Sequence, residues 1–111
     1  MAVNSLNLIE PKTVESSQTT QYVATDCITI IDKFTATNVD ASNRTVTINI
    51  VASGGSPTLA NTIVKSREIA PNETYTMPEL IGQILNNGDY ISAIASASNS
   101  IVIRVSGREI T

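Results

Sequence analysis

The chain of 111 residues contains no histidine, no tryptophan and one cysteine, Cys27. Without histidine it cannot form a Ser-His-Asp triad, a Cys-His pair or a metal site built on imidazole. One cysteine also excludes an intrachain disulfide and a cysteine-based metal site. At the start of an apolar run, Cys27 is predicted to be a buried, unreactive side chain. We therefore predict no cofactor, no metal and no enzymatic activity.

Charge is also sparse, since only 15% of the residues are charged and the net charge is −3. The seven lysines and arginines are scattered, and nucleic-acid binding needs them clustered. No apolar run approaches the length of a membrane span. The first residues, MAVNS, lack the basic and apolar regions of a signal peptide. We expect neither a nucleic-acid nor a membrane partner, and a protein made and kept in a cytoplasm.

The residues that are abundant favour strands. Residues 27–38 (CITIIDKFTATN) and 44–51 (RTVTINIV) are rich in β-branched side chains. Turn formers fill the break at 38–43, so we predict that the two runs form a hairpin. In the second run Val46, Ile48 and Ile50 share one face, which is the period of a strand with one dry side.

The first run contains one exception to this alternation. Ile28, Ile30, Phe34 and Ala36 are in phase and are predicted to face the core, but Asp32 falls on the same face. Two interpretations remain open. Either Asp32 is a buried carboxylate with a partner, or a bulge shifts the register at this point.

Further strands are predicted at 18–24, 62–70, 74–77, 89–95 and 100–108. Residues 78–85 have helical spacing, with Thr76 and Glu79 as a capping box, and the Gly/Ser/Pro loop at 53–61 is predicted to be solvated and mobile. Counted together, about eight short strands recur every ten residues or so. The expected fold is therefore all-β, an antiparallel jelly-roll-like sandwich with one short helical turn.

The N-terminal segment 1–17 is predicted to be an arm or an edge strand, and 18–111 the sandwich domain. Its apolar members before Pro11 are Val3, Leu6, Leu8 and Ile9. Such a segment either completes the chain's own sheet or lies on a neighbouring molecule. The sequence leaves both alternatives open.

No group of residues points to catalysis. Asp26, Asp40 and Asp89 lie in predicted turns, where carboxylates bond to the backbone. No spacing forces two carboxylates together as an acid–base pair. Sugar-binding jelly rolls use exposed aromatic platforms, and this chain has only three tyrosines and one phenylalanine.

Several segments carry a resemblance to small virion proteins of tailed phages. They are CITIIDKFTATN (27–38), VASGGSPTLANTIV (51–64), SREIAPNETYTMPEL (66–80), 88–91 and the ending VSGREIT (105–111). From about Gln18 onward, the chain resembles the capsid staple, or decoration, proteins of short-tailed Salmonella phages of the epsilon-fifteen type. The shared features are strand and turn patterns, not catalytic motifs.

The resemblance implies a jelly-roll-like structural virion protein on the outer capsid surface, which clamps neighbouring major capsid proteins. It also implies a homodimer at two-fold positions, with the host cytoplasm as the place of assembly. No contact residue is carried over from the family. We expect the capsid contacts at Val3, Leu6, Leu8 and Ile9 because these side chains are apolar. The alternatives are another virion part, such as a head fibre base or tail adaptor, and a carbohydrate-binding module.

Overall fold

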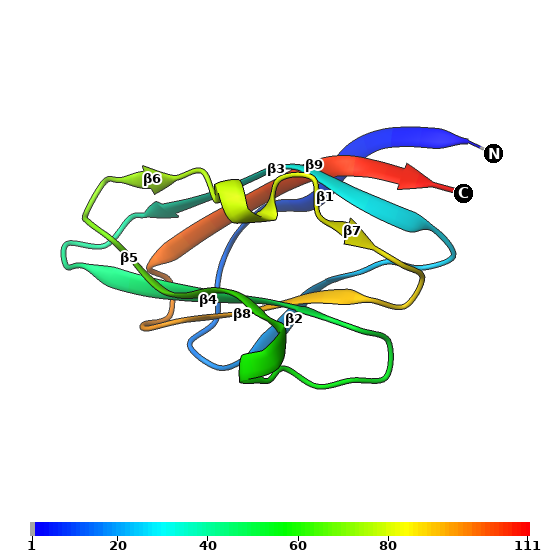
Figure 1. Ribbon diagram of the computed structural model, residues 1–111. Coiled ribbons are helices and arrows are strands. Elements are labelled where there is room, and N and C mark those ends of the chain that lie inside the picture. The colour runs from blue at the N-terminus through cyan, green and yellow to red at the C-terminus, as the bar shows by residue number, and fades with distance from the viewer. Residues whose placement is uncertain (1) are drawn as a thin grey trace.

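A computed structural model describes residues 2–111, which form two antiparallel sheets packed face to face (Figure 1). There is no α-helix in these residues, only the single 3-10 turns η1 and η2. The elements are β1 (Val3–Thr13), β2 (Thr19–Val23), β3 (Ile28–Asn38), β4 (Arg44–Val51), η1 (Leu59–Asn61), β5 (Thr62–Ile69), β6 (Thr74–Tyr75), η2 (Pro78–Leu80), β7 (Ile84–Leu85), β8 (Tyr90–Ala95) and β9 (Ile101–Ile110).

The strands pair as one long hairpin rolled into a sandwich. β1 pairs with β9, β2 with β8, β3 with β6 and β7, and β4 with β5, each time antiparallel. Rolling places β1-β9-β3-β6 in one sheet and β2-β8-β4-β5 in the other. This is jelly-roll topology, and the predicted fold class is confirmed. Nine strands replace the expected eight because β6 and β7 pair with opposite ends of β3.

The predicted hairpin of 27–38 with 44–51 is wrong. β3 pairs with β9, β6 and β7, while β4 pairs with β5 and β8 in the other sheet. The connection is therefore an arch between the two sheets. Buried Asn38 holds this arch, because its Nδ2 donates to the carbonyl oxygens of Ser42 and Ile69, each at 2.8 Å. Turn residues predict a reversal of the chain but not whether the two arms pair.

The exception at Asp32 is a bulge. Pairing between β3 and β9 shifts register between Ile31 and Lys33, and Asp32 is exposed. Because of this register shift, the prediction that Ile28 faces the core is wrong. Thr29 and Ile31 are fully buried, whereas Ile28 is 43% exposed. Past the bulge, the predicted core positions Phe34 and Ala36 are fully buried.

The core between the sheets is almost entirely aliphatic. Phe34 is its one buried ring, and Cys27 is buried and free as predicted. Among the described residues, every buried side-chain nitrogen and oxygen has a hydrogen-bond partner. The buried polar groups are thus satisfied by hydrogen bonds, as protein interiors require.

One local prediction needs correction, and a second can be described further. The helical turn at Pro78–Leu80 has Met77 in a left-handed conformation at its start and no side-chain cap, so the capping box with Thr76 is wrong. The carboxylate of Glu79 instead accepts the hydroxyl of Tyr75. The Gly/Ser/Pro loop is largely exposed to solvent, as predicted, and buried Asn49 donates to the carbonyl of Thr58 near its end at 3.0 Å.

The N-terminal segment completes the chain's own sheet. β1 runs beside β9 from Val3 to Thr13, with irregular register between Asn7 and Ile9 and again between Ile9 and Lys12. Beyond β1, Val14 is fully buried in the core. The first part of β1 and the end of β9 extend together at one end of the sandwich (Figure 1).

Candidate interaction surface

An apolar row crosses three strands where the chain termini meet. Val3 of β1 lies opposite Ile110 of β9, which lies opposite Ile28 of β3. One residue further along, Glu109 and Thr29 point between the sheets, where Tyr22 bonds to both. Because side chains alternate along a strand, Val3, Ile110 and Ile28 face outward. Val3 is 57% exposed, so the row is open to a partner.

A second outward row lies next to the first. Ser5 of β1 lies opposite Arg108, Arg108 opposite Ile30, and Ile30 opposite Ile84 of β7. Ile84 is 57% exposed. The two rows together place five aliphatic side chains on the outer face of the five-stranded sheet. We call Val3, Ile28, Ile30, Ile84 and Ile110 the terminal patch.

One ion pair borders the terminal patch. The guanidinium of Arg108 donates from Nη2 to Asp32 Oδ1 at 2.9 Å and from Nε to Asp32 Oδ2 at 3.0 Å. The bulge at Asp32 places its carboxylate there. This contact raises the pKa of Arg108 further above its usual value. An apolar patch with a charged rim has the composition of a protein-binding surface.

The four residues predicted to contact a capsid do not lie on one surface. Val3 belongs to the terminal patch, whereas Leu6 is 39% exposed opposite Gly107. Leu8 packs partly buried against the core, and Ile9 is buried opposite Val105. As the chain is folded here, Val3 and Leu6 are the accessible members of the set.

Most of the terminal patch was not predicted from the sequence. Ile28 and Ile30 look like core residues until the register shift at Asp32 is taken into account, and Ile84 lies in a segment with helical spacing. The available signal was Asp32 itself. A charge in an apolar phase indicates that the residues before and after it face opposite sides.

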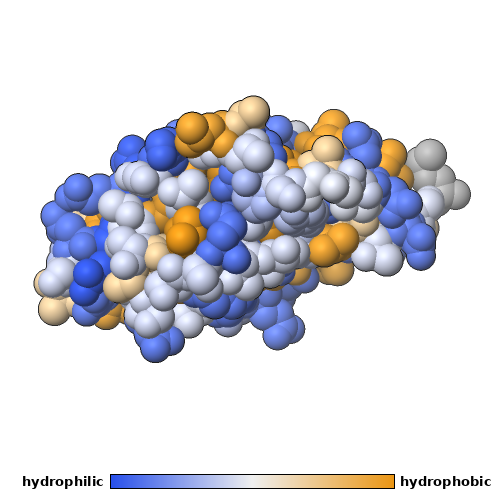
Figure 2. Space-filling model, turned by 90° about the horizontal axis from the view of Figure 1, so that it is seen from below, coloured by the Kyte–Doolittle hydropathy of each residue, from blue (hydrophilic) through white to orange (hydrophobic). Residues whose placement is uncertain are grey.

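The outer face of the four-stranded sheet is different in character. Figure 2 views the molecule from this side, and hydrophilic residues cover most of the face, with hydrophobic ones as separate spots. Asn49 of β4 is only 3% exposed because the loop from β4 to η1 lies over it. Its Nδ2 also donates to Asn61 Oδ1 at 2.8 Å and Thr62 Oγ1 at 3.1 Å. At Asn49 this face is covered by the chain itself.

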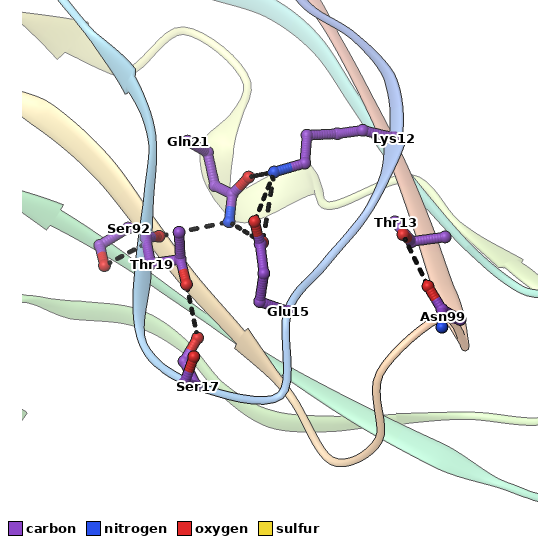
Figure 3. Close-up of polar contacts among 8 residues, drawn as sticks. All are labelled: Lys12, Thr13, Glu15, Ser17, Thr19, Gln21, Ser92 and Asn99. Carbon is purple, nitrogen blue, oxygen red and sulfur yellow. Dashed lines mark hydrogen bonds and ion pairs between the residues drawn. The ribbon is translucent and has the colours of Figure 1, made fainter.

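A polar groove lies where the chain passes from β1 to β2. Its volume is about 480 Å³, and it is lined by Lys12, Thr13, Val14, Glu15, Ser16, Ser17, Ser98 and Asn99. Figure 3 shows Lys12, Glu15 and Gln21 pointing toward one another, with Thr13 and Asn99 as a separate contact. Lys12 Nζ donates to Glu15 at 3.0 Å and to Gln21 Oε1 at 2.6 Å. Gln21 Nε2 in turn donates to Glu15 at 3.0 Å.

These contacts determine the electrostatics of the groove. Hydrogen bonds from Gln21 and Lys12 lower the pKa of the Glu15 carboxyl below its usual value. Ionised glutamate and lysine that bond to each other provide neither a free base nor an activated nucleophile. The hydrogen bonds in the groove therefore connect β1 to β2, and its geometry does not indicate catalysis.

The aromatic side chains are all engaged within the fold. Phe34 is fully buried, and the hydroxyl of Tyr22 lies between the sheets. Tyr75 lies under the guanidinium of Arg67, 4.0 Å from the ring centre, and Tyr90 donates to a loop carbonyl. A sugar platform needs an aromatic face free for stacking. Phe34 is excluded as such a platform because it is buried, and one face of Tyr75 is covered by Arg67.

Of the three carboxylates predicted to bond to the backbone in turns, Asp40 and Asp89 do so, whereas Asp26 contributes its backbone N–H, which donates to Asn87 Oδ1 at 2.8 Å. Asp40 accepts the amide of Ala41 at 2.8 Å, and Asp89 accepts the amide of Asn86 at 2.9 Å. Within residues 2–111, no three acidic, cysteine or histidine side chains converge as metal ligands. None of the helical turns in the same residues is long or apolar enough to span a bilayer.

No protein-family model, curated protein or solved structure matches this chain. The terminal patch and the resemblance to staple proteins are therefore the two observations that bear on function.

Proposed function

We propose that this protein is a structural virion protein that decorates the outer surface of a phage capsid. Its partner is the major capsid protein, and it clamps neighbouring copies so that the head is stabilised. It assembles in the host cytoplasm and remains on the virion surface. The observation that carries the proposal is the terminal patch, an apolar surface on a rigid sheet, together with the resemblance to staple proteins.

Two physical properties of the molecule support the proposed clamp. A clamp needs a rigid body and an adhesive surface, and the jelly roll fixes all five residues of the terminal patch on paired strands. A protein that binds the assembled shell and not its free subunits shifts the assembly equilibrium toward the shell. Many copies, each with a modest contact, together resist pressure from inside.

Two single substitutions test the proposal. In Ile84→Lys a charge enters the terminal patch, whereas Leu59→Lys adds the same charge at a 78% exposed position on the loop over the other sheet. Purified variants are sedimented with decoration-free heads of a short-tailed Salmonella phage of the epsilon-fifteen type. We expect Ile84→Lys to weaken binding by about tenfold or more, because a desolvated charge opposes an apolar contact. Leu59→Lys should bind as the unmodified protein does.

Failure of the unmodified protein to sediment with the heads would contradict the proposal. Equal binding by the two variants would remove the terminal patch from it. Binding to lipopolysaccharide in place of heads would favour the carbohydrate-binding alternative. Sedimentation with tails or fibres alone would favour another virion part.

A further inference from the structure

The sandwich has several strand edges, and most of them are protected against pairing with another chain. β5 carries Lys65, Arg67 and Glu68 along its edge, and β6 and β7 are two residues each with η2 between them. β2 is short and irregular, and the side chain of Gln21 donates to the carbonyl of Thr19 at 3.2 Å. Charges, interruptions and bulges are the usual protections of a sheet edge.

The first part of β1 has none of these protections. Residues Val3 to Asn7 pair with β9 in regular register and contain no charge and no proline. Bulges and the residues Glu10, Pro11 and Lys12 begin only after this segment. Every side chain from Val3 to Asn7 is exposed. A regular, uncharged edge of this kind is a template for a further strand.

The hydrogen bonding at the termini shows which backbone groups are free. Ala2 and Thr111 exchange two bonds, at 3.1 and 2.9 Å, so they form a hydrogen-bonded pair. Such pairs alternate along an antiparallel ladder, which directs the N–H and C=O groups of Val3, Ser5 and Asn7 away from β9. No residue between 2 and 111 pairs with this edge.

We propose that the occupant of this edge is a second copy of the chain, paired antiparallel through residues Val3 to Asn7 with Ser5 on the two-fold axis. This register uses all the free groups, because Ser5 faces Ser5 of the second copy and Val3 faces Asn7 of the second copy. Each facing pair exchanges two backbone hydrogen bonds. The segment is uncharged, so pairing with itself brings no like charges together.

The pairing has a consequence for the terminal patch. The two five-stranded sheets become continuous, and the row Ile84, Ile30, Arg108 and Ser5 continues into the same row of the second copy. Both patches then face the same side of one sheet, on either side of the axis. A two-fold interface must be self-complementary in this way. One dimer would thus hold two capsid subunits, and binding at two points raises its overall affinity.

A contact through one short strand segment is smaller than the roughly 1,200 Å² of a stable interface. The dimer should therefore form in solution in a concentration-dependent manner. This inference refines the dimer within the proposed function, but its test needs no heads. Failure of the pairing and failure of capsid binding are for that reason distinguishable.

Cysteine cross-linking tests the register. Facing residues of a hydrogen-bonded pair have Cα atoms about 5.5 Å apart, which is within reach of a disulfide. Under mild oxidation, Ser5→Cys should give disulfide-linked dimers in several-fold higher yield than Val3→Cys or Asn7→Cys alone. A mixture of Val3→Cys and Asn7→Cys should cross-link as Ser5→Cys does. The native Cys27 is buried and does not compete.

A second measurement does not depend on disulfides. In sedimentation, the mass of the unmodified chain should rise with concentration toward that of a dimer. Ser5→Lys should abolish the rise, whereas Thr20→Lys, the same kind of change on the edge strand β2, should preserve it. Equal cross-linking by Ser5→Cys and Asn7→Cys would overturn the proposal. A mass that stays monomeric at all concentrations, or that Ser5→Lys leaves unchanged, would overturn it as well.

Discussion

On the four-stranded sheet, the segment after β4 covers Asn49 on the outer face, whereas on the five-stranded sheet the terminal patch is left open. Both faces are built on the same kind of strand, with alternating aliphatic and polar residues. The difference lies in what the chain does after the strand ends. We therefore expect a mutation at Asn49 to change stability and a mutation in the terminal patch to change binding.

The largest expected effect is at Gly107, beneath the terminal patch. A β-carbon here would overlap the carbonyl oxygen of Ile30 and lie 2.8 Å from Leu8 Cδ1, so Gly107→Ala must move β3 away from β9. We expect a loss of about 3 kcal/mol or more in the free energy of unfolding, measured by urea denaturation. Gly54→Ala is the control. It meets no neighbouring atoms and carries only the strain of its positive φ, about 1–2 kcal/mol. Similar losses for both would contradict the close approach at Gly107.

Asn49→Ala should be next in size. It removes a buried amide whose Nδ2 donates to the carbonyl of Thr58, to Asn61 Oδ1 and to Thr62 Oγ1. We expect the free energy of unfolding to fall by about 2–3 kcal/mol, with head binding unchanged. Asn7→Ala, on the outer face of the other sheet, removes an exposed amide and should cost less than about 0.5 kcal/mol. A loss of head binding by Asn49→Ala would show that the two faces are not separate in function.

Tyr22→Phe tests the polar contact between the sheets. Burial, and then the hydrogen bond to Glu109, raise the pKa of the Tyr22 hydroxyl above its usual value of 10.0. The unfolded chain loses this proton above pH 10 while the folded chain keeps it. The stabilisation is therefore complete below pH 10 and declines as the pH rises beyond it.

We expect Tyr22→Phe to cost about 1–2 kcal/mol at neutral pH and to flatten the alkaline decline, measured by thermal unfolding from pH 8 to 11. Tyr75→Phe is the comparison at neutral pH, because the pKa of Tyr75 is also raised, mainly by Glu79, but its hydroxyl is exposed and its loss should cost less stability. An alkaline decline that Tyr22→Phe leaves unchanged would contradict this account.

The smallest effect on stability is expected within the terminal patch itself. Ile28→Thr keeps a β-branched side chain at an exposed strand position, so the free energy of unfolding should change by less than about 0.5 kcal/mol. Head affinity should nevertheless fall several-fold, as measured by the sedimentation described above. A large loss of stability would mean that Ile28 serves the fold and not a partner.

The architecture could be predicted because period-two patterns and turn residues are local signals. The pairing partners of each strand could not be predicted, because the turn residues between β3 and β4 are compatible both with a hairpin and with a connection between two sheets. The terminal patch was hidden for a related reason. One extra residue at Asp32 reverses which side of β3 each preceding side chain faces, so Ile28 and Ile30 have the sequence signature of a core and the location of a surface.

The pairing of β1 with β9 also determines when the terminal patch can form. These strands come from opposite ends of the chain, so closing them carries the largest entropy cost of any pair in the fold. During synthesis, Val3 leaves the ribosome early and must wait for Ile110, its neighbour in the sheet. A chain without β9 would therefore display neither the complete terminal patch nor a β1 edge held in register.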